Sequence, residues 1–184
     1  MQLFPPKNEV SNVSQDGQGN TQQIAATINN TYTNITTPLA EARKASILQE
    51  VIEDILELSV SLEVTELDVK IFDIEKKVDY NQIVGYKASF DFFMSNKQVI
   101  QSRLDVLESI GNPLATKKLF TVIRNIYHKY IHLTNPDEII KAMQDELTTS
   151  LLTAEPDNYD NITFVPSVIF YVFSECQIFK KPLT

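Results

Sequence analysis

Few residues of this chain carry side chains that commonly act in catalysis or metal binding. The sequence contains two histidines, one cysteine and no tryptophan. His128 and His132 are four residues apart, so on a helix their rings would share one face, where they could bind one metal ion. The residues between them lack the glutamate of an HExxH pattern, and no third ligand is evident. We therefore expect two surface histidines and no metal site.

The remaining candidate groups favour structural roles. Cys176 lies in an apolar stretch without a histidine partner, which is typical of a cysteine that fills a core. Glu53 and Glu57 are neighbours on one acidic helix face rather than an acid and a base isolated in a pocket. Gly17-x-Gly19 lacks the third glycine and the preceding strand of a dinucleotide-binding loop. We expect no enzymatic activity and no cofactor.

Arg124 is the charged residue that most needs a partner. It lies within an apolar run, with Tyr127 one helical step away. A buried guanidinium requires a carboxylate or several carbonyl groups, so it marks either a structural clamp or a subunit contact. We favour the structural clamp.

The negative charge is concentrated in one part of the chain. Of the formal net charge of −8, residues 38–76 contribute −6, from 4 basic and 10 acidic residues. Nucleic acids are bound by clustered lysine and arginine, so this distribution argues against direct binding of nucleic acid. No apolar stretch is long enough to span a membrane, and Met1 leads into polar sequence rather than an export signal. We expect a cytoplasmic protein without membrane contact.

The elements that would position these groups are predicted to be helices. Residues 1–37 form a polar arm, which is either flexible or forms a short β-hairpin around Asp16-Gly17-Gln18-Gly19-Asn20 when several copies pair. An acidic amphipathic helix should begin after Thr36-Thr37-Pro38 and extend to about residue 64, within a segment 38–66. Residues 67–184 then form the third part, which begins with an irregular segment at residues 67–77.

Further helices are predicted at about residues 80–109, 115–133, 135–152 and 164–180. Gly111-Asn112-Pro113 should end the first of these, and Asn135-Pro136-Asp137 should begin the third. Residues 164–173 are nearly all apolar, which suits a buried strand as well as a helix. A strand would have no sheet to join, so we predict a helix at the centre of an all-α, irregular bundle of about five helices.

Three segments of the second half resemble a known protein family. They are Lys77-Val78-Asp79-Tyr80-Asn81-Gln82-Ile83, with Tyr86-Lys87 following; Val122-Ile123-Arg124-Asn125-Ile126-Tyr127; and Phe173-Ser174-Glu175-Cys176-Gln177-Ile178-Phe179-Lys180-Lys181-Pro182. Together they are similar to the helical C-terminal domain of ABC-three-component systems, the bacterial anti-phage group that includes Lamassu-type defences. The resemblance covers residues 68–184.

The resemblance implies an adaptor in a defence complex. In the family, the domain usually follows an effector such as a nuclease and connects it to an SMC-like ABC ATPase and a middle component. Here a polar arm and an acidic helix stand in place of the effector, which favours a recruiting, sensing or oligomerising subunit. The signature positions implied by the resemblance, structural or interfacial rather than catalytic, are Tyr80, Asn81, Arg124, Tyr127, Cys176, Phe179 and Pro182.

Two functional hypotheses follow. The first is a non-catalytic assembly subunit that links the ABC ATPase, the middle component or an effector, in a complex where this chain is itself a homo-oligomer. The alternative is a self-assembling structural protein that oligomerises through its N-terminal arm.

Overall fold

The computed structural model describes residues 25–58, 73–154, 156 and 159–182, with side chains from residue 39 onward. The chain divides into two compact units, residues 1–40 and 41–184. Within the described residues there are helices and no strand, which confirms the predicted all-α class.

In the first unit, the described backbone is helical. Helix α1 (Ala25–Glu57) begins thirteen residues before the start expected after Pro38, and the boundary between the units falls within it. A proline inside a helix removes one backbone hydrogen bond, yet the helix continues through Pro38. Residues 25–37 are therefore helical, and the proposed hairpin turn at residues 16–20 lies outside the described residues.

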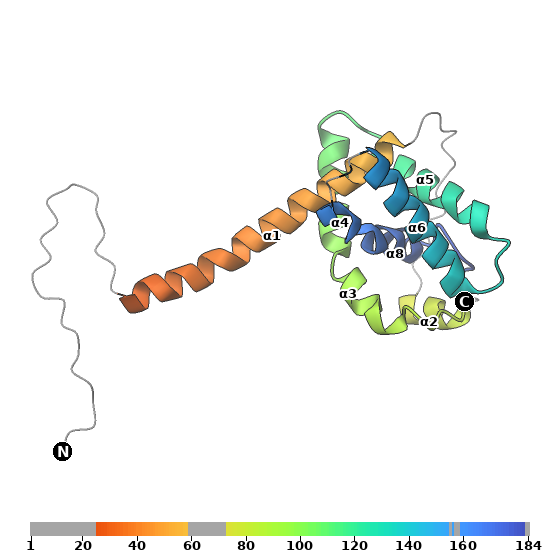
Figure 1. Ribbon diagram of the computed structural model, residues 1–184, viewed down its shortest axis with the longest axis horizontal. Coiled ribbons are helices and arrows are strands. Elements are labelled where there is room, and N and C mark those ends of the chain that lie inside the picture. Colours follow the sequence, from red (N-terminus) through yellow and green to blue (C-terminus); the bar gives the residue numbers. More distant parts are fainter. Residues whose placement is uncertain (1–24, 59–72, 155, 157–158, 183–184) are drawn as a thin grey trace, which may run out of the picture. The chain divides into compact units, whose positions relative to one another are not determined.

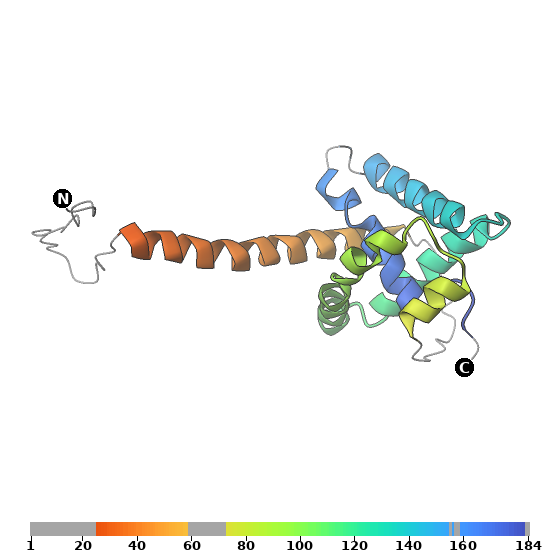
Figure 2. The same cartoon turned by 90° about the horizontal axis from the view of Figure 1, so that it is seen from below.

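The second unit is a helical bundle built around one apolar helix. Helix α8 (Val165–Ser174) is buried along almost its entire length, because apolar side chains cover every face of it. It contacts α3 (Phe90–Met94), α4 (Lys97–Ser109), α5 (Ala115–Tyr130) and α6 (Pro136–Ala154), which surround it in Figure 1. The perpendicular view in Figure 2 shows the same central position. The prediction of a central helix here is confirmed.

The same core includes the part of α1 that lies in the second unit. Leu48, Val51, Ile52 and Ile55 are fully buried and belong to one cluster with the side chains of α8. Their spacing of three and four residues places them on one face, while Glu50 and Glu57 are exposed and Glu53 and Asp54 are half-buried. The apolar face of the acidic helix thus completes the bundle.

The predicted helix over residues 80–109 is divided into several shorter elements. Helix α2 (Ile74–Tyr80) starts inside the segment expected to be irregular, because the Asp73 carboxylate accepts hydrogen bonds from the first free N–H groups, those of Glu75 and Lys76. A turn then leads to the 3₁₀ helix η1 (Lys87–Ser89), to α3 and to α4.

Two predicted boundaries are confirmed. Helix α4 ends at Ser109, and Gly111 adopts a φ of 130°, with the Asn112 N–H donating to the Leu107 carbonyl at 3.0 Å. At the start of α6, the Asn135 side chain accepts a hydrogen bond from the Asp137 N–H at 3.0 Å, and Pro136 occupies the first helical position. A short helix, α7 (Tyr159–Ile162), connects α6 to α8.

Candidate interaction site

The residues that follow α8 form a compact turn rather than the predicted continuation of the helix to residue 180. In this C-terminal turn, residues 175–182, the Cys176 N–H donates to the Phe173 carbonyl and the Gln177 N–H to the Val172 carbonyl. Cys176 itself has a φ of 58°. This pair of bonds with a left-handed residue between them is the Schellman arrangement that ends helices. Cys176 thus lies just after the last helix, where its buried thiol fills space.

A buried lysine forms hydrogen bonds with the backbone at both ends of the bend that joins α8 to the C-terminal turn. Lys77 on α2 is fully buried, and its ammonium donates hydrogen bonds to the carbonyl of Phe173 at 2.5 Å and that of Ile178 at 2.9 Å. The same Nζ lies 4.1 Å from the centroid of the Phe173 ring, within the range of a cation–π interaction. Burial lowers the pKa of Lys77 to about 8, and the neighbouring Cys176 opposes this decrease.

Asn81 forms hydrogen bonds with the backbone of Lys180, near the end of the C-terminal turn. Its amide nitrogen donates to the carbonyls of Lys77 and Lys180, both at 2.8 Å, and its amide oxygen accepts from the Lys180 N–H at 3.0 Å. The side chain therefore satisfies both backbone groups of Lys180, about a hundred residues away in sequence. This pairing explains why an asparagine, with one donor and one acceptor group, suits this position.

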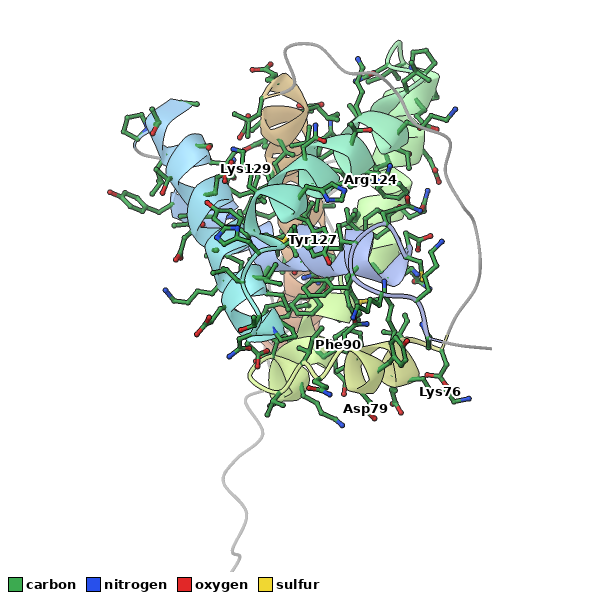
Figure 3. All side chains as sticks on the ribbon, turned by 90° about the vertical axis from the view of Figure 1, so that its right-hand side faces the viewer. Lys76, Asp79, Phe90, Arg124, Tyr127 and Lys129 are labelled. Carbon is green, nitrogen blue, oxygen red and sulfur yellow. The ribbon has the colours of Figure 1, made fainter. Side chains whose placement is uncertain are left out.

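Helix α5 supplies the third contact to the C-terminal turn. The Arg124 guanidinium donates to the Gln177 side-chain oxygen at 2.5 Å, and the Tyr127 and Phe179 rings lie with their centroids 4.9 Å apart. Both α5 side chains extend from the helix toward the chain after α8 (Figure 3). Arg124 is only half-buried, and its printed partner is a neutral amide. Arg124 thus contacts the C-terminal turn through one neutral amide oxygen, and not through the buried carboxylate or set of carbonyls expected from the sequence.

The three segments that carry the family resemblance therefore meet at one place. Four of the seven predicted signature residues, Tyr80, Asn81, Tyr127 and Phe179, line a groove of about 460 Å³. Arg124, Cys176 and Pro182 do not line it, and they belong to the C-terminal turn or its support.

The residues that line this groove include Tyr80, Gln82, Tyr127, Ile131, Phe179 and Lys180. Its walls come from the end of α2, the end of α5, the connection from α5 to the start of α6, and the C-terminal turn. Burial raises the pKa of Tyr127 above that of a free tyrosine, and a hydrogen bond with the Phe179 backbone opposes the increase. The tyrosine hydroxyl is thus neutral and tied to the C-terminal turn, which makes Tyr127 a fixed wall of the groove.

Sequence reasoning missed the importance of Lys77 and Gln177. A signal for Lys77 was present, because Ile74, Lys77, Val78 and Asn81 recur at the three- and four-residue spacing of one helix face. That periodicity places Lys77 on the buried side of α2. No comparable signal marks Gln177, whose role depends on a turn that leaves the helical pattern.

The groups considered for catalysis are not assembled into a site in the described part of the chain. His128 and His132 are both exposed, and His132 Nδ1 lies 2.8 Å from the Lys129 carbonyl. Glu53 accepts a hydrogen bond from Gln49 at 2.9 Å. Within the described ranges, no group of three or more His, Cys, Asp or Glu side chains could hold a metal ion. Nor does any helix there have the length and apolar character needed to cross a membrane.

Comparison of the chain with models of protein families, with curated proteins and with solved structures found no match.

Proposed function

We propose that this chain is a non-catalytic assembly subunit that works by binding other protein chains in a bacterial anti-phage defence complex. Its partners in this proposal are an SMC-like ABC ATPase, a middle component or a separate effector, as the family resemblance implies. The protein would act in the cytoplasm and would carry neither a cofactor nor a metal.

The observation that carries this proposal is the convergence of the three resembling segments. Lys77 and Asn81 from α2, and Arg124 and Tyr127 from α5, all contact the C-terminal turn. Contacts of this kind define the shape of a surface rather than a reaction centre, because none of them leaves a nucleophile or base facing an enclosed cavity. A defined surface beside half-exposed aromatic rings suits protein recognition.

Co-expression tests the proposal directly. The tagged chain would be produced with the ABC ATPase encoded beside its gene, purified by affinity, and passed over a sizing column with light scattering. We expect a complex of defined mass that contains both proteins, whereas an ABC ATPase from an unrelated locus should not be retained. A chain that elutes alone beside its own neighbour would contradict the proposal, and a large homo-oligomer without partner would favour self-assembly instead.

A further inference from the structure

Aromatic and aliphatic side chains are exposed to solvent around the groove. Tyr80 is 44% exposed and Ile131 is 53% exposed, and both border the groove together with the half-buried rings of Tyr127 and Phe179. Aromatic side chains around a hollow dominate binding energy at protein interfaces, since they bury much area with little loss of side-chain entropy. The groove therefore has the composition of a site that anchors an apolar side chain.

The charge at the groove is opposite to that of the chain. Among the described residues that line it, Lys180 is the only charged one, in a protein whose net charge is −8. Within the described part of the chain, the Lys180 ammonium has no ion-pair partner, while both backbone groups of Lys180 are held by Asn81. A fixed backbone with an unpaired cation at the edge of an apolar hollow is complementary to a carboxylate.

Two residues that line the groove adopt an unfavourable backbone conformation. Gln82 has a φ of 55° and Phe179 a φ of 62°, in the left-handed region that glycine occupies most easily. Gln82 follows α2 in a Schellman arrangement, in which its N–H donates to Asp79 and that of Ile83 donates to Val78. Non-glycine residues in this region concentrate at sites that clamp ligands. The Phe179 ring contacts both Tyr127, with centroids 4.9 Å apart, and the buried ring of Phe173, at 5.7 Å.

We propose that the groove binds a short linear segment of a partner protein, which places an aromatic or branched aliphatic side chain among Tyr80, Tyr127 and Ile131 and a carboxylate against Lys180. This inference rests on the proposed assembly function and names the chemistry of the partner at that site.

The size of the groove favours a short segment over a second folded copy of the chain. A hollow of about 460 Å³ lies in the range of pockets that enclose small ligands and single anchoring side chains. Stable interfaces between folded proteins bury roughly 800 Å² on each partner, which requires a broad surface rather than one hollow. Charge also opposes self-association, because two copies of a chain with a net charge of −8 repel each other.

Peptide selection against the full chain tests this inference. Randomised twelve-residue peptides would be displayed and selected on the whole protein, and the affinities of the recovered peptides measured by fluorescence polarisation. We expect recovered sequences to share an aromatic or branched aliphatic residue next to Asp or Glu. Replacing that acidic residue by its amide should weaken binding about fivefold, and replacing the apolar residue by alanine should weaken it about tenfold or more.

Protein variants locate the binding surface. Ile131→Ser should weaken the selected peptide about tenfold, and Lys180→Glu about fivefold or more, with binding partly restored to a peptide whose acidic residue is changed to lysine. The matched controls are Ile110→Ser, which alters an isoleucine that is 71% exposed beyond the end of α4, and Lys117→Glu, which makes the same charge change on α5 outside the groove. Both controls should bind as the unchanged protein does.

Three results would overturn the inference: no shared motif among the recovered peptides, equal binding to Ile131→Ser, or a dimer in sedimentation that the groove variants dissociate. The test is independent of the assembly function. If the selected peptide binds Ile131→Ser as well as the unchanged protein while the ABC ATPase still co-purifies, the assembly role stands and the groove assignment fails. If the peptide binds the groove but no neighbouring protein co-purifies, the assignment of the groove holds and the assembly role fails.

Discussion

Because the ammonium of Lys77 is buried, we predict that the contribution of Lys77 to the free energy of unfolding increases as the pH rises above 8. The pKa of Lys77 is lowered from 10.5 to about 8 by burial. Between these two pH values, the unfolded chain binds more protons at this residue than the folded chain, and stability rises with pH wherever that holds. Below pH 8 both states are protonated, and the folded state carries the full cost of burying the charge. Above pH 10.5 both are neutral and that cost is absent.

The magnitude follows from the same two values. From pH 7 to pH 9.5, a group with pKa values of 8 folded and 10.5 unfolded adds about 2 kcal/mol to the free energy of unfolding. Lys77→Met is the reference variant, because methionine has a similar length and no titratable group. Urea denaturation of both proteins across this pH range gives the difference between their free energies of unfolding. Groups that are present in both proteins, such as the tyrosines, contribute equally to each value and cancel in this difference.

The groups around Lys77 define the control for this measurement. Cys176, Glu175 and Lys181 all affect its pKa, and Cys176 is the one of these that raises it most. The same comparison in a Cys176→Ala background removes the effect of the thiol on Lys77. A difference between lysine and methionine proteins that stays flat or falls from pH 7 to pH 9.5 would refute the reasoning. It would mean that the carbonyls of Phe173 and Ile178 keep the ammonium at its ordinary pKa.

Three further substitutions test the contacts at the C-terminal turn and one helix end, each by urea denaturation at pH 7. Asn81→Ala removes a side chain that bonds to both backbone groups of Lys180, so we expect a loss of about 1–3 kcal/mol, and an unchanged midpoint would show that water replaces it without cost. Arg124→Ala should cost only about 1 kcal/mol, because the arginine is half-buried and Gln177 is neutral; a loss above about 3 kcal/mol would indicate a buried charge partner instead. Gly111→Ala should cost about 1–3 kcal/mol through backbone strain alone, since nothing lies within 4 Å of the added carbon, and a neutral result would contradict the φ of 130°.

The helix ends show what the sequence could and could not predict. Helices α2, α4 and α8 are each followed by a residue with positive φ, and the sequence indicated only the end of α4, because glycine stands at that position, Gly111. After α2 and α8 the same position is held by Gln82 and Cys176, which local sequence rules do not associate with a helix end. The predicted helices over residues 80–109 and 164–180 therefore differ from the structure at these two points.

The reason lies in tertiary contacts rather than local preference. Glutamine and cysteine resist the left-handed region, so another interaction must compensate for the strain. At Cys176 the compensation comes from Lys77, which binds the carbonyls on either side of the turn, and at Gln82 the preceding Asn81 pairs with Lys180. Both contacts join residues about a hundred positions apart. Periodicity within a window of one helix cannot reveal them, whereas it did reveal the helices and the central place of α8.

The two irregular helix ends also form the surface to which we assign partner binding. Residues 81 and 82 and residues 179 and 180 all line the groove, so the bonds that stabilise the turns also fix the position of its walls. An apolar residue at position 77 would pack in the core, but the Ile178 carbonyl would lose its bond to the ammonium and the Phe173 carbonyl would keep only the Cys176 N–H, whereas the lysine bonds to both carbonyls. Lys77→Met should accordingly weaken peptide binding in the groove even at a urea concentration where the variant remains fully folded. Equal affinity for the selected peptide in the two folded proteins would show that the groove keeps its shape without this lysine.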